Sequence, residues 1–375
     1  MTRFIGSEIY RAAPFGAHHP LAIPRVSTVM DLCRSLGWFA QGHYVPSPRA
    51  RPAALAAFHT PDYIAALLEA EASGTVSDDV RARHGLGTLS NPVHGLMYRR
   101  PATSAGGALL AAEMVAQGGI VQVPGAGTHH AMADRAGGFC YLNDPVLAIL
   151  HLRRLGLKRV AYVDIDAHHC DGVEAGLAGA EGVMLLSVHE DKRWPFTGAL
   201  TDDGGGNCLN LPVPRGFNDS EMAHVREALI LPALEAFRPD AVVLQCGADA
   251  VEEDPLSRLS LSNNAHVAVL RAVRSMTDRL IVTGGGGYNP WSVARCWTRL
   301  WTEIAGHELP DRLPPEAVAL MEGLHWPRRA AGRNPPRVWF ETLADPARPG
   351  PLREAVTGGV ALLRNRLPDL RAWPG

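Results

Sequence analysis

Short apolar runs alternate with longer amphipathic segments along the middle of the chain. Strands are predicted at the short apolar runs, and helices where apolar positions recur every three or four residues. The predicted strands cover residues 119–124, 159–166, 182–189, 240–247 and 279–287, and the predicted helices cover residues 102–117, 142–156, 219–237, 263–276 and 289–306. Continuous apolar strands separated by helices are typical of a parallel sheet that is covered on both faces. The pattern therefore predicts an α/β fold with an open parallel sheet.

The first hundred residues are less regular. Two helices are predicted there, over residues 25–37 and 60–74. Thr60 is suited to the N-cap of the second helix, and Pro61 to its first position. The remaining segments are rich in proline and glycine, which predicts loops.

The domain organisation follows from the spacing of these elements. No linker separates the elements between residues 102 and 305, and the chain beyond residue 310 is rich in proline. We therefore expect a single domain over residues 1–375, with a core at about 7–305. The C-terminal extension, residues 306–375, is expected to pack on this core as irregular structure or short helices.

The composition and charge of the chain argue against several functional classes. The 375 residues are 46% hydrophobic and 20% charged, with a formal net charge of −2. Without a block of lysine or arginine, direct nucleic-acid binding is not expected, and no apolar segment is long enough to predict a membrane partner. The six scattered cysteines do not form CxxC pairs and indicate a reducing compartment. Because the N-terminus also lacks the apolar run of a signal peptide, a cytoplasmic location is expected.

The stretch VDIDAHHCDG, residues 163–172, places an unusual density of charge at the end of an apolar strand. In an extended chain alternate side chains share a face, so Asp164, Asp166 and His168 are expected on one side. Neighbouring carboxylates repel each other, and a divalent cation would remove this repulsion. Asp249, which follows another predicted strand, is the best candidate for a further ligand. Two aspartates and one histidine would form an open, catalytic type of metal site.

The structural alternative has to be weighed against this metal site. A single acid at a strand end more often caps a helix or pairs with a lysine. The stretch contains no lysine or arginine that could neutralise its acids, however, which favours the metal for the set as a whole.

Histidine pairs offer acid–base chemistry near neutral pH. His129 and His130 follow the strand at 119–124 and could act as base and acid, oriented by Asp164 and Asp171. Two structural histidines in a polar loop are the alternative. The pair His18–His19 is expected to be structural or exposed, and His169 is expected to serve packing or hydrogen bonding.

The run GGGGYNP, residues 284–290, leaves two interpretations open. Glycines after a strand could cradle a phosphate at the next helix. Alternatively, they line a narrow channel and place Tyr288 to stabilise an oxyanion.

Four motifs resemble those of one family. They are GTHHAMADRAGGFCYLND (127–144), VDIDAHHCDGV (163–173), CGADAVEEDPL (246–256) and GGGGYNP (284–290). In order and spacing, the chain resembles the histone deacetylase superfamily, as a bacterial class II-like member. That superfamily includes acetoin-utilisation deacetylases and acetylpolyamine amidohydrolases on an arginase-like fold. The resemblance extends from about residue 7 to about residue 305.

The resemblance implies specific roles for these residues. Asp166, His168 and Asp249 would bind the catalytic metal, Zn²⁺ or Fe²⁺. His130 would be the general base and acid, with His129 as its electrostatic partner, Asp164 orienting His129 and Asp171 orienting His130. Tyr288 would polarise the scissile carbonyl. A structural K⁺ would be held by Asp164, by Ser187 and Val188, and by the backbone carbonyls of Asp166 and His168.

The resemblance also implies a substrate tunnel, with Gly138, Phe139 and Cys140 on one wall and Trp194 opposite. Leu256 would occupy a gate position, and Arg25 an acetate-release channel, with a surface charge as the simpler alternative for Arg25. Four positions depart from the family pattern. Cys170 replaces a glycine, Ser90 and Asn91 stand where relatives carry a rim aspartate, and Leu256 stands where polyamine-specific relatives carry glutamate.

The expected activity is hydrolysis of an N-acyl amide, such as the N-acetyl amide of an acyl-lysine or of a small acylated amine, by metal-activated water. An acetylpolyamine amidohydrolase and a catalytically silent acyl-ligand binder are the alternatives, together with a two-metal ureohydrolase and, more weakly, a phosphate-binding module. Loops such as 75–100 could rim a neighbouring copy's pocket in a homo-oligomer.

Overall fold

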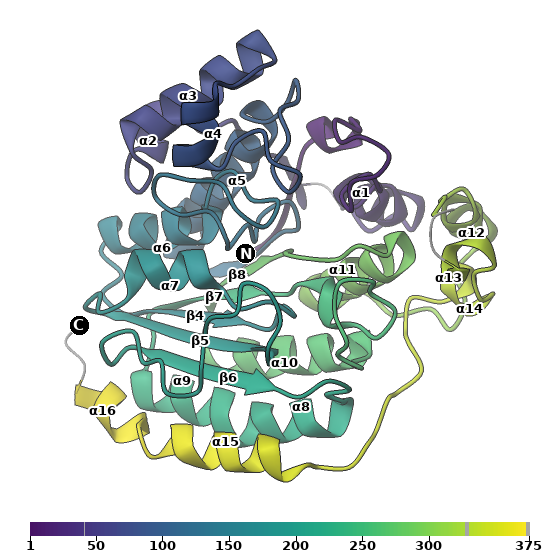
Figure 1. The fold of residues 1–375 in the computed structure, drawn as a ribbon. Helices are drawn as coiled ribbons and strands as arrows, with labels where there is room; N and C mark the ends of the chain where they lie inside the picture. The colour runs from purple at the N-terminus through teal and green to yellow at the C-terminus, as the bar shows by residue number, and fades with distance from the viewer. Residues whose placement is uncertain (41, 327–329, 373–375) are drawn as a thin grey trace.

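A single parallel sheet of eight strands forms the centre of the molecule (Figure 1). The computed structural model describes residues 1–40, 42–326 and 330–372, with only the backbone described for residues 371 and 372. The strands are β1 (Thr2–Gly6), β2 (Tyr44–Pro46), β3 (Gly119–Val123), β4 (Val160–Asp164), β5 (Val183–Glu190), β6 (Cys208–Val213), β7 (Ala241–Gln245) and β8 (Arg279–Thr283), in the order β2-β1-β3-β8-β7-β4-β5-β6. The predicted open parallel sheet is confirmed.

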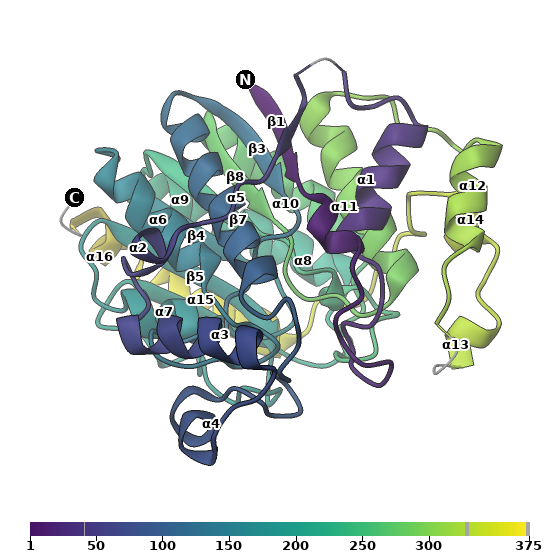
Figure 2. The ribbon, with the colours of Figure 1, turned by 90° about the horizontal axis from the view of Figure 1, so that it is seen from above.

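Helices cover both faces of the sheet, which explains why β4, β5 and β7 are buried along their whole length. On one face α5 (Arg99–Ala116), α6 (Asp144–Arg154) and α7 (Asp171–Leu177) pack on side chains such as Tyr162. On the other face lie α1 (Val26–Ser35), α8 (Asp219–Val225), α9 (Leu231–Phe237), α10 (Asn263–Met276) and α11 (Pro290–Ala305). Figures 1 and 2 show these two layers of helices with the sheet between them.

The predicted helices and strands of the central region occur with shifts of a few residues at their ends. The predicted helix 219–237 is observed as α8 and α9 joined through a π-helical turn, Arg226–Ile230. The helix expected at 60–74 is α3 (Pro61–Ser73), in which the Thr60 hydroxyl accepts a hydrogen bond from the Tyr63 N–H. Shorter helices are α2 (Pro52–Leu55), α4 (Asp78–His84), α12 (Pro315–Glu322), α13 (Ala330–Arg333), α14 (Val338–Glu341), α15 (Glu354–Arg364) and α16 (Leu367–Ala372), with 3₁₀ turns at Glu8–Arg11 and Ala248–Ala250.

Three strands were not predicted from the sequence. β2 has only three residues and ends in Pro46, and β6 contains Asn210 and Pro212, so neither shows a continuous apolar run. Both lie at the edges of the sheet, where proline is tolerated. β1 pairs with β2 and β3 and begins at Thr2. The sheet therefore starts before residue 7, the expected beginning of the core.

The register of the sheet brings the ends of four adjacent strands level with one another and with Ser187 of β5, which continues to Glu190. Val123, Thr283, Gln245, Asp164 and Ser187 are successive partners across β3, β8, β7, β4 and β5. In parallel sheets the loops beyond the carboxyl ends form binding sites. The five loops that follow these strands therefore meet at one edge.

The C-terminal segment contacts the same core. Val356, Val360 and Leu363 of α15 belong to the apolar cluster beneath the sheet, and α15 is drawn below α8 and α9 in Figure 1. An ion pair of 2.5 Å joins Arg295 of α11 to Asp345, and both side chains are buried. None of the helices in the described ranges has the length and apolar character needed to cross a membrane.

Replacing Asp345 with alanine should destabilise the whole molecule. Arg295 would keep a buried charge without its partner, which typically costs roughly 3–5 kcal/mol. We expect the Tm to fall by roughly 5–10 °C in a thermal unfolding experiment. Asp311→Ala, at an exposed position, is the matched control and should leave the Tm within about 1 °C of the wild type. Equal Tm values for the two variants would show that the C-terminal segment does not stabilise the core.

Candidate metal and catalytic site

Three potential metal ligands converge where the strand-end loops meet. Asp166 and His168 come from the loop after β4, and Asp249 from the loop after β7. One ligand atom from each lies within 4.8 Å of the other two, and all three residues are buried. The His168 Nδ1 is 3.2 Å from Asp166 Oδ1 and 2.9 Å from Asp249 Oδ2. These are the residues expected from the Asp-x-His spacing and from the position of Asp249 after a neighbouring strand.

The surroundings of these residues fit a divalent cation. A Cβ atom at Gly247 would lie 2.0 Å from Asp166 Oδ2, and one at Gly286 would lie 1.9 Å from Asp249 Oδ2. Only glycine therefore allows the two loops to approach the carboxylates so closely. Burial and the neighbouring Asp166 carboxylate raise the pKa of Asp249 to about 6. A bound cation would favour the ionised form of both acids, and carboxylate and imidazole are suitable ligands for zinc or iron.

The two histidines of the β3–α6 connection each hydrogen-bond a carboxylate. His129 Nδ1 lies 2.8 Å from Asp164 Oδ2, and His130 Nδ1 lies 2.7 Å from Asp171 Oδ1. Both Nδ1 atoms can donate to these carboxylates, which leaves the Nε2 atom of a neutral His130 as a proton acceptor. The imidazole centroids of His129 and His130 are 4.0 Å apart, and that of His130 is 5.9 Å from His168. His130 is therefore next to the metal ligands.

Their surroundings give the two histidines different charges. Burial disfavours the charged form of His129, but Asp164 and Asp166 outweigh it and raise the pKa to about 9. Burial and the neighbouring His129 lower the pKa of His130 to about 4, against the opposing effect of Asp171. At neutral pH this leaves a cationic His129 beside a neutral His130, an arrangement suited to a general base.

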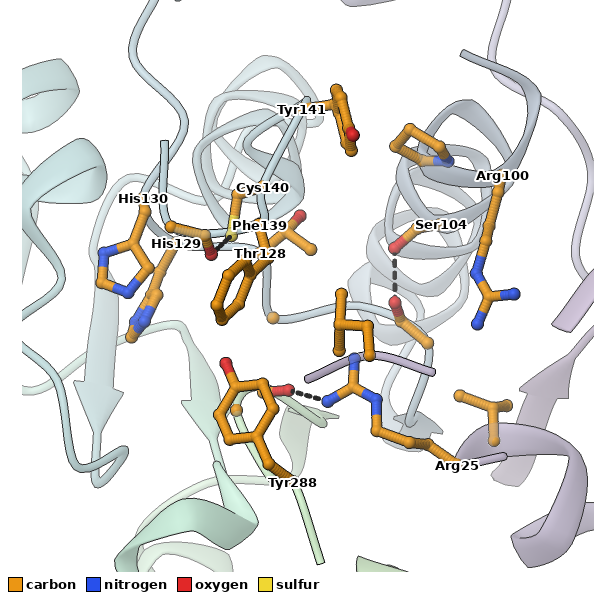
Figure 3. Close-up of a pocket in the computed structure, with 18 of the residues that line it drawn as sticks. Arg25, Arg100, Ser104, Thr128, His129, His130, Phe139, Cys140, Tyr141 and Tyr288 are labelled. Carbon is orange, nitrogen blue, oxygen red and sulfur yellow. Dashed lines mark hydrogen bonds between the residues drawn. The ribbon is translucent and has the colours of Figure 1, made fainter. Parts of the chain in front are cut away.

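Tyr288 lies in the same pocket as the histidines (Figure 3). Its backbone N–H donates to Asp254 Oδ2 at 2.6 Å, and its ring is 5.6 Å from that of Phe139. Of the two interpretations of the glycine run, channel lining agrees with the contacts. The Gly286 N–H donates to Asp166, whereas the Gly285 carbonyl accepts from Arg25 at 2.8 Å.

The residues expected along the tunnel lie in two adjoining spaces. Gly138, Phe139 and Cys140 line the pocket that contains the metal ligands. The ring of Trp194 is 41% exposed and lies 4.7 Å from His130, beside Gly138. Leu256 lines a neighbouring groove that also reaches Tyr288.

Arg25 is not a surface charge, so the simpler alternative for this residue is wrong. It stands at the N-cap of α1 and lines the pocket. Ser187, whose side chain was expected near Asp164, is the register partner of Asp164 on β5, and Val188 follows it.

Several neighbouring residues have structural roles. His169 is buried and contacts Thr197 and Glu174 through its two ring nitrogens, as expected for hydrogen bonding. His19 stacks on Phe15 and contacts the edge of Phe139, so it supports the tunnel wall. Cys170 has φ −80° and a buried thiol. The position does not require the conformational freedom of glycine.

Sequence reasoning missed three residues that shape the site. Gln245 donates to Asp166 Oδ2 at 3.0 Å, and its polar side chain at the end of an apolar strand was an available signal. Asp254 holds the backbone of Tyr288. Asn143 donates its side-chain amide to the carbonyls of His129 and Ala131, and so holds the loop of the histidine pair.

His59 in turn supports Asn143. Its Nε2 accepts the Asn143 N–H at 2.9 Å, and its Nδ1 lies 3.3 Å from the Ala133 carbonyl. These contacts require a neutral ring that carries its proton on Nδ1. Burial lowers the pKa of His59 to about 4.

The fold and the site together place a candidate metal centre at the carboxyl edge of a parallel sheet. A family model, the histone deacetylase domain, matches residues 19–304. The chain belongs to the histone deacetylase family.

The relatives include eukaryotic and bacterial proteins. Acetoin utilization protein AcuC of Bacillus subtilis is 33% identical over 84% of this chain and 85% of its own length. Histone deacetylase 1 of Oryza sativa subsp. japonica is 37% identical over 80% of this chain and 59% of its own length, so this chain matches about three fifths of that relative. Histone deacetylase 8 of Xenopus tropicalis is 35% identical over 77% of this chain and 80% of its own.

A solved structure has the same fold. The crystal structure of an HDAC homolog from Aquifex aeolicus superimposes with a TM-score of 0.92 at 34% identity. The alignment covers 97% of this chain and 99% of the homolog. The arginase/deacetylase-like fold expected from the sequence is confirmed.

The ligand set predicts one transition metal per chain. Asp249→Asn should weaken Zn²⁺ binding by at least about 100-fold, because a neutral amide replaces a charged ligand. Metal content by mass spectrometry and Zn²⁺ titration of the apo-protein would measure this change. Asp171→Asn, which removes an acid outside the ligand set, should retain one equivalent. Two equivalents in the wild-type protein would instead support a two-metal ureohydrolase.

His59 should make the stability depend on pH. Because its folded-state pKa is below the ordinary value, its neutral form stabilises the fold fully above about pH 6.5. This contribution is lost as the pH falls toward 4 and amounts to up to about 3 kcal/mol. In denaturant titrations, His59→Gln should therefore lose less stability than the wild type between pH 6.5 and 4.5. The exposed His325, replaced in the same way, should leave the slope unchanged. Equal slopes for all three proteins would contradict this assignment.

Proposed function

We propose that this protein is a metal-dependent amidohydrolase that removes an acyl group, such as acetyl, from an amine. The observation that carries the proposal is the convergence of Asp166, His168 and Asp249. The pocket that Asp166 and His168 line also contains His130, which is hydrogen-bonded to a carboxylate. Membership of the histone deacetylase family supports it. The amide C–N bond is the bond that such a site would cleave.

The metal would be Zn²⁺ or Fe²⁺, held by Asp166, His168 and Asp249. When bound, it acts as a Lewis acid toward the substrate carbonyl and lowers the pKa of water. A K⁺ would lie behind it, held by Asp164, Ser187 and Val188 and by the backbone carbonyls of Asp166 and His168. The alignment of Asp164 with Ser187 on adjacent strands supports this second site.

The side chains around the metal site have separate roles in the reaction. His130 Nε2 takes a proton from the attacking water and later gives it to the departing amine, while Asp171 holds Nδ1. The positive charge of His129, fixed by Asp164, favours the negative charge that develops nearby. The Tyr288 hydroxyl donates to the carbonyl oxygen as it becomes an oxyanion. Burial raises the pKa of Tyr288 well above its ordinary value and keeps this proton in place.

The substrate would be an acyl-lysine or a small acylated amine. The groove beside Tyr288 is lined by Leu256, which does not select a cationic amine, so an acetylpolyamine amidohydrolase is the second candidate. The side chain of Asn91 is buried and donates to the Cys140 carbonyl rather than reaching a substrate. A protein that binds an acyl ligand without catalysis would not need both the hydroxyl of Tyr288 and the base His130.

We further propose a cytoplasmic enzyme without direct nucleic-acid or membrane partners. The formal net charge of −2 and the absence of a basic block support this assignment. A homo-oligomer whose loops rim neighbouring pockets is also proposed, from the loops at 75–100.

Tyr288→Phe should separate binding from turnover. We expect kcat to fall by about 10²–10³, because one oxyanion donor is lost, while the affinity for a metal-binding inhibitor stays within a few fold. The assay compares acetyl-lysine peptide, acetylpolyamine and aryl acetamide with the purified, metal-loaded enzyme. His19→Gln alters a residue behind the tunnel wall and serves as the structural comparison.

Failure of the wild-type enzyme on every one of these substrates would overturn the proposed function. Full activity of Tyr288→Phe would overturn the role of its hydroxyl but leave the reaction class standing.

A further inference from the structure

The pocket that holds the metal ligands continues past Tyr288 into a second chamber. Asp166, His168 and Tyr288 line one part of it, and Tyr10, Ser104 and Arg100 line another. Figure 3 shows the histidine pair at one end and Arg100 at the other, with Tyr288 and Arg25 between them. We call the part lined by Tyr10, Arg25, Arg100 and Ser104 the inner chamber.

The free space of the pocket is shared between the metal site and the inner chamber. The whole pocket encloses about 80 Å³. Since roughly 10–15 Å³ is enough for one water molecule, the pocket has room for about five such volumes. A longer acyl chain could therefore extend inward beyond the scissile carbonyl.

Two arginines face this chamber from different helices. Arg25, at the start of α1, donates from Nη1 to the carbonyls of Gly285 and Gly287, at 2.8 and 3.4 Å. Arg100, in α5, donates from Nη1 to the Ala12 carbonyl at 2.9 Å, and its guanidinium lies 5.2 Å from the Tyr10 ring centroid. A guanidinium has five N–H donors, so each side chain has donors to spare.

Neither arginine is neutralised by an acid. Within the described residues, no carboxylate lies within 4.0 Å of either guanidinium, although many other arginines of the chain have such partners. Asp144, a buried acid behind the chamber wall, accepts from Ser104 and from the Gly127 N–H instead. The only carboxylate that lines the pocket is Asp166, which belongs to the metal site.

The two guanidinium groups therefore repel each other across the inner chamber. Burial, with a contribution from the charge of Arg25, lowers the pKa of Arg100 to about 10. Burial also lowers the pKa of Arg25. Two like charges in a largely desolvated space attract an anion, and a carboxylate matches the planar fork of a guanidinium.

We propose that the inner chamber is a carboxylate subsite and that the enzyme hydrolyses amides whose acyl chain ends in a carboxylate, such as N-succinyl-amines. This inference rests on the proposed amide hydrolysis and names its acyl class. The acyl carbonyl lies beside Tyr288 and His130, and the chain points inward so that its terminal carboxylate reaches Arg100 and Arg25.

The reaction is ordinary hydrolysis and needs no further co-reactant. Water adds to the amide carbonyl, the C–N bond breaks, and the amine leaves with the proton that His130 delivers. The products are a free dicarboxylate and the amine. Free acetate, released from an acetyl substrate, is also a carboxylate and could bind the same arginines. The experiment therefore has to distinguish the terminal carboxylate of an acyl chain from the free acetate product.

Three peptides with one modified lysine separate the possibilities. They carry N-succinyl, N-succinamoyl and N-acetyl groups, and the second is a neutral isostere of the first. For the wild-type enzyme, kcat/KM for succinyl should exceed that for succinamoyl by about tenfold or more, as expected when a charged hydrogen-bond partner is added.

Variants of adjacent arginines test which side chain is responsible. Arg100→Gln should reduce the succinyl-to-succinamoyl ratio at least about tenfold, and Arg100→Lys should recover part of it. Arg99→Gln is the matched control, because Arg99 is exposed and pairs with Glu71 outside the pocket. Its ratio should equal that of the wild type.

The outcomes are distinct. Cleavage of the acetyl peptide with a succinyl-to-succinamoyl ratio of one or less would overturn the carboxylate subsite and leave the proposed function intact. Inhibition by free acetate that depends on Arg100, without succinyl cleavage, would also overturn it and identify a product channel. No cleavage of any peptide would remove the proposed function and this inference together. If Arg100→Gln does not fold, the succinyl-to-succinamoyl ratio of the wild-type enzyme still tests the carboxylate subsite.

Discussion

Buried negative charge at the edge of the sheet is the constraint on which the rest of the structure depends. Asp164, Asp166 and Asp249 are fully buried, and no lysine or arginine side chain forms an ion pair with them in the described part of the chain. Unpaired charges in such surroundings cost several kcal/mol each. Hydrogen bonds from His129 and Gln245 and from backbone amides offset part of this cost. These donors come from loops after different strands, so the site forms only when the sheet is correctly assembled.

The central part of the fold could be predicted because its strands are buried on both faces. A strand such as β7 must then be apolar throughout, and this pattern is visible in any single sequence. The strands β2 and β6 lie at the edges of the sheet, where proline is tolerated, so their sequences resemble loops. β1 is short and begins with polar residues. Its place between β2 and β3 depends on pairing with distant segments.

Some residues of the site could likewise be predicted from the sequence, and others could not. Spacing within one loop brought Asp166 and His168 together on physical grounds, because alternate residues share a face. The pairing of His129 with Asp164 and of His130 with Asp171 spans 35 and 41 residues, and family resemblance suggested it before distances of 2.8 and 2.7 Å agreed with it. Arg100 could not be found from sequence, since a surface helix and a buried pocket give the same local pattern.

The two ends of the pocket place different demands on a substrate. Around the mouth, Trp194 and Leu256 present apolar surface, which accepts many amines without selecting their charge. At the inner end, Arg25 and Arg100 present positive charge in a space largely removed from water, where electrostatic interactions are strong. An apolar wall distinguishes ligands weakly, whereas an unpaired buried charge discriminates strongly between a charged and a neutral partner. Selectivity in this enzyme is therefore expected to reside in the acyl group more than in the amine.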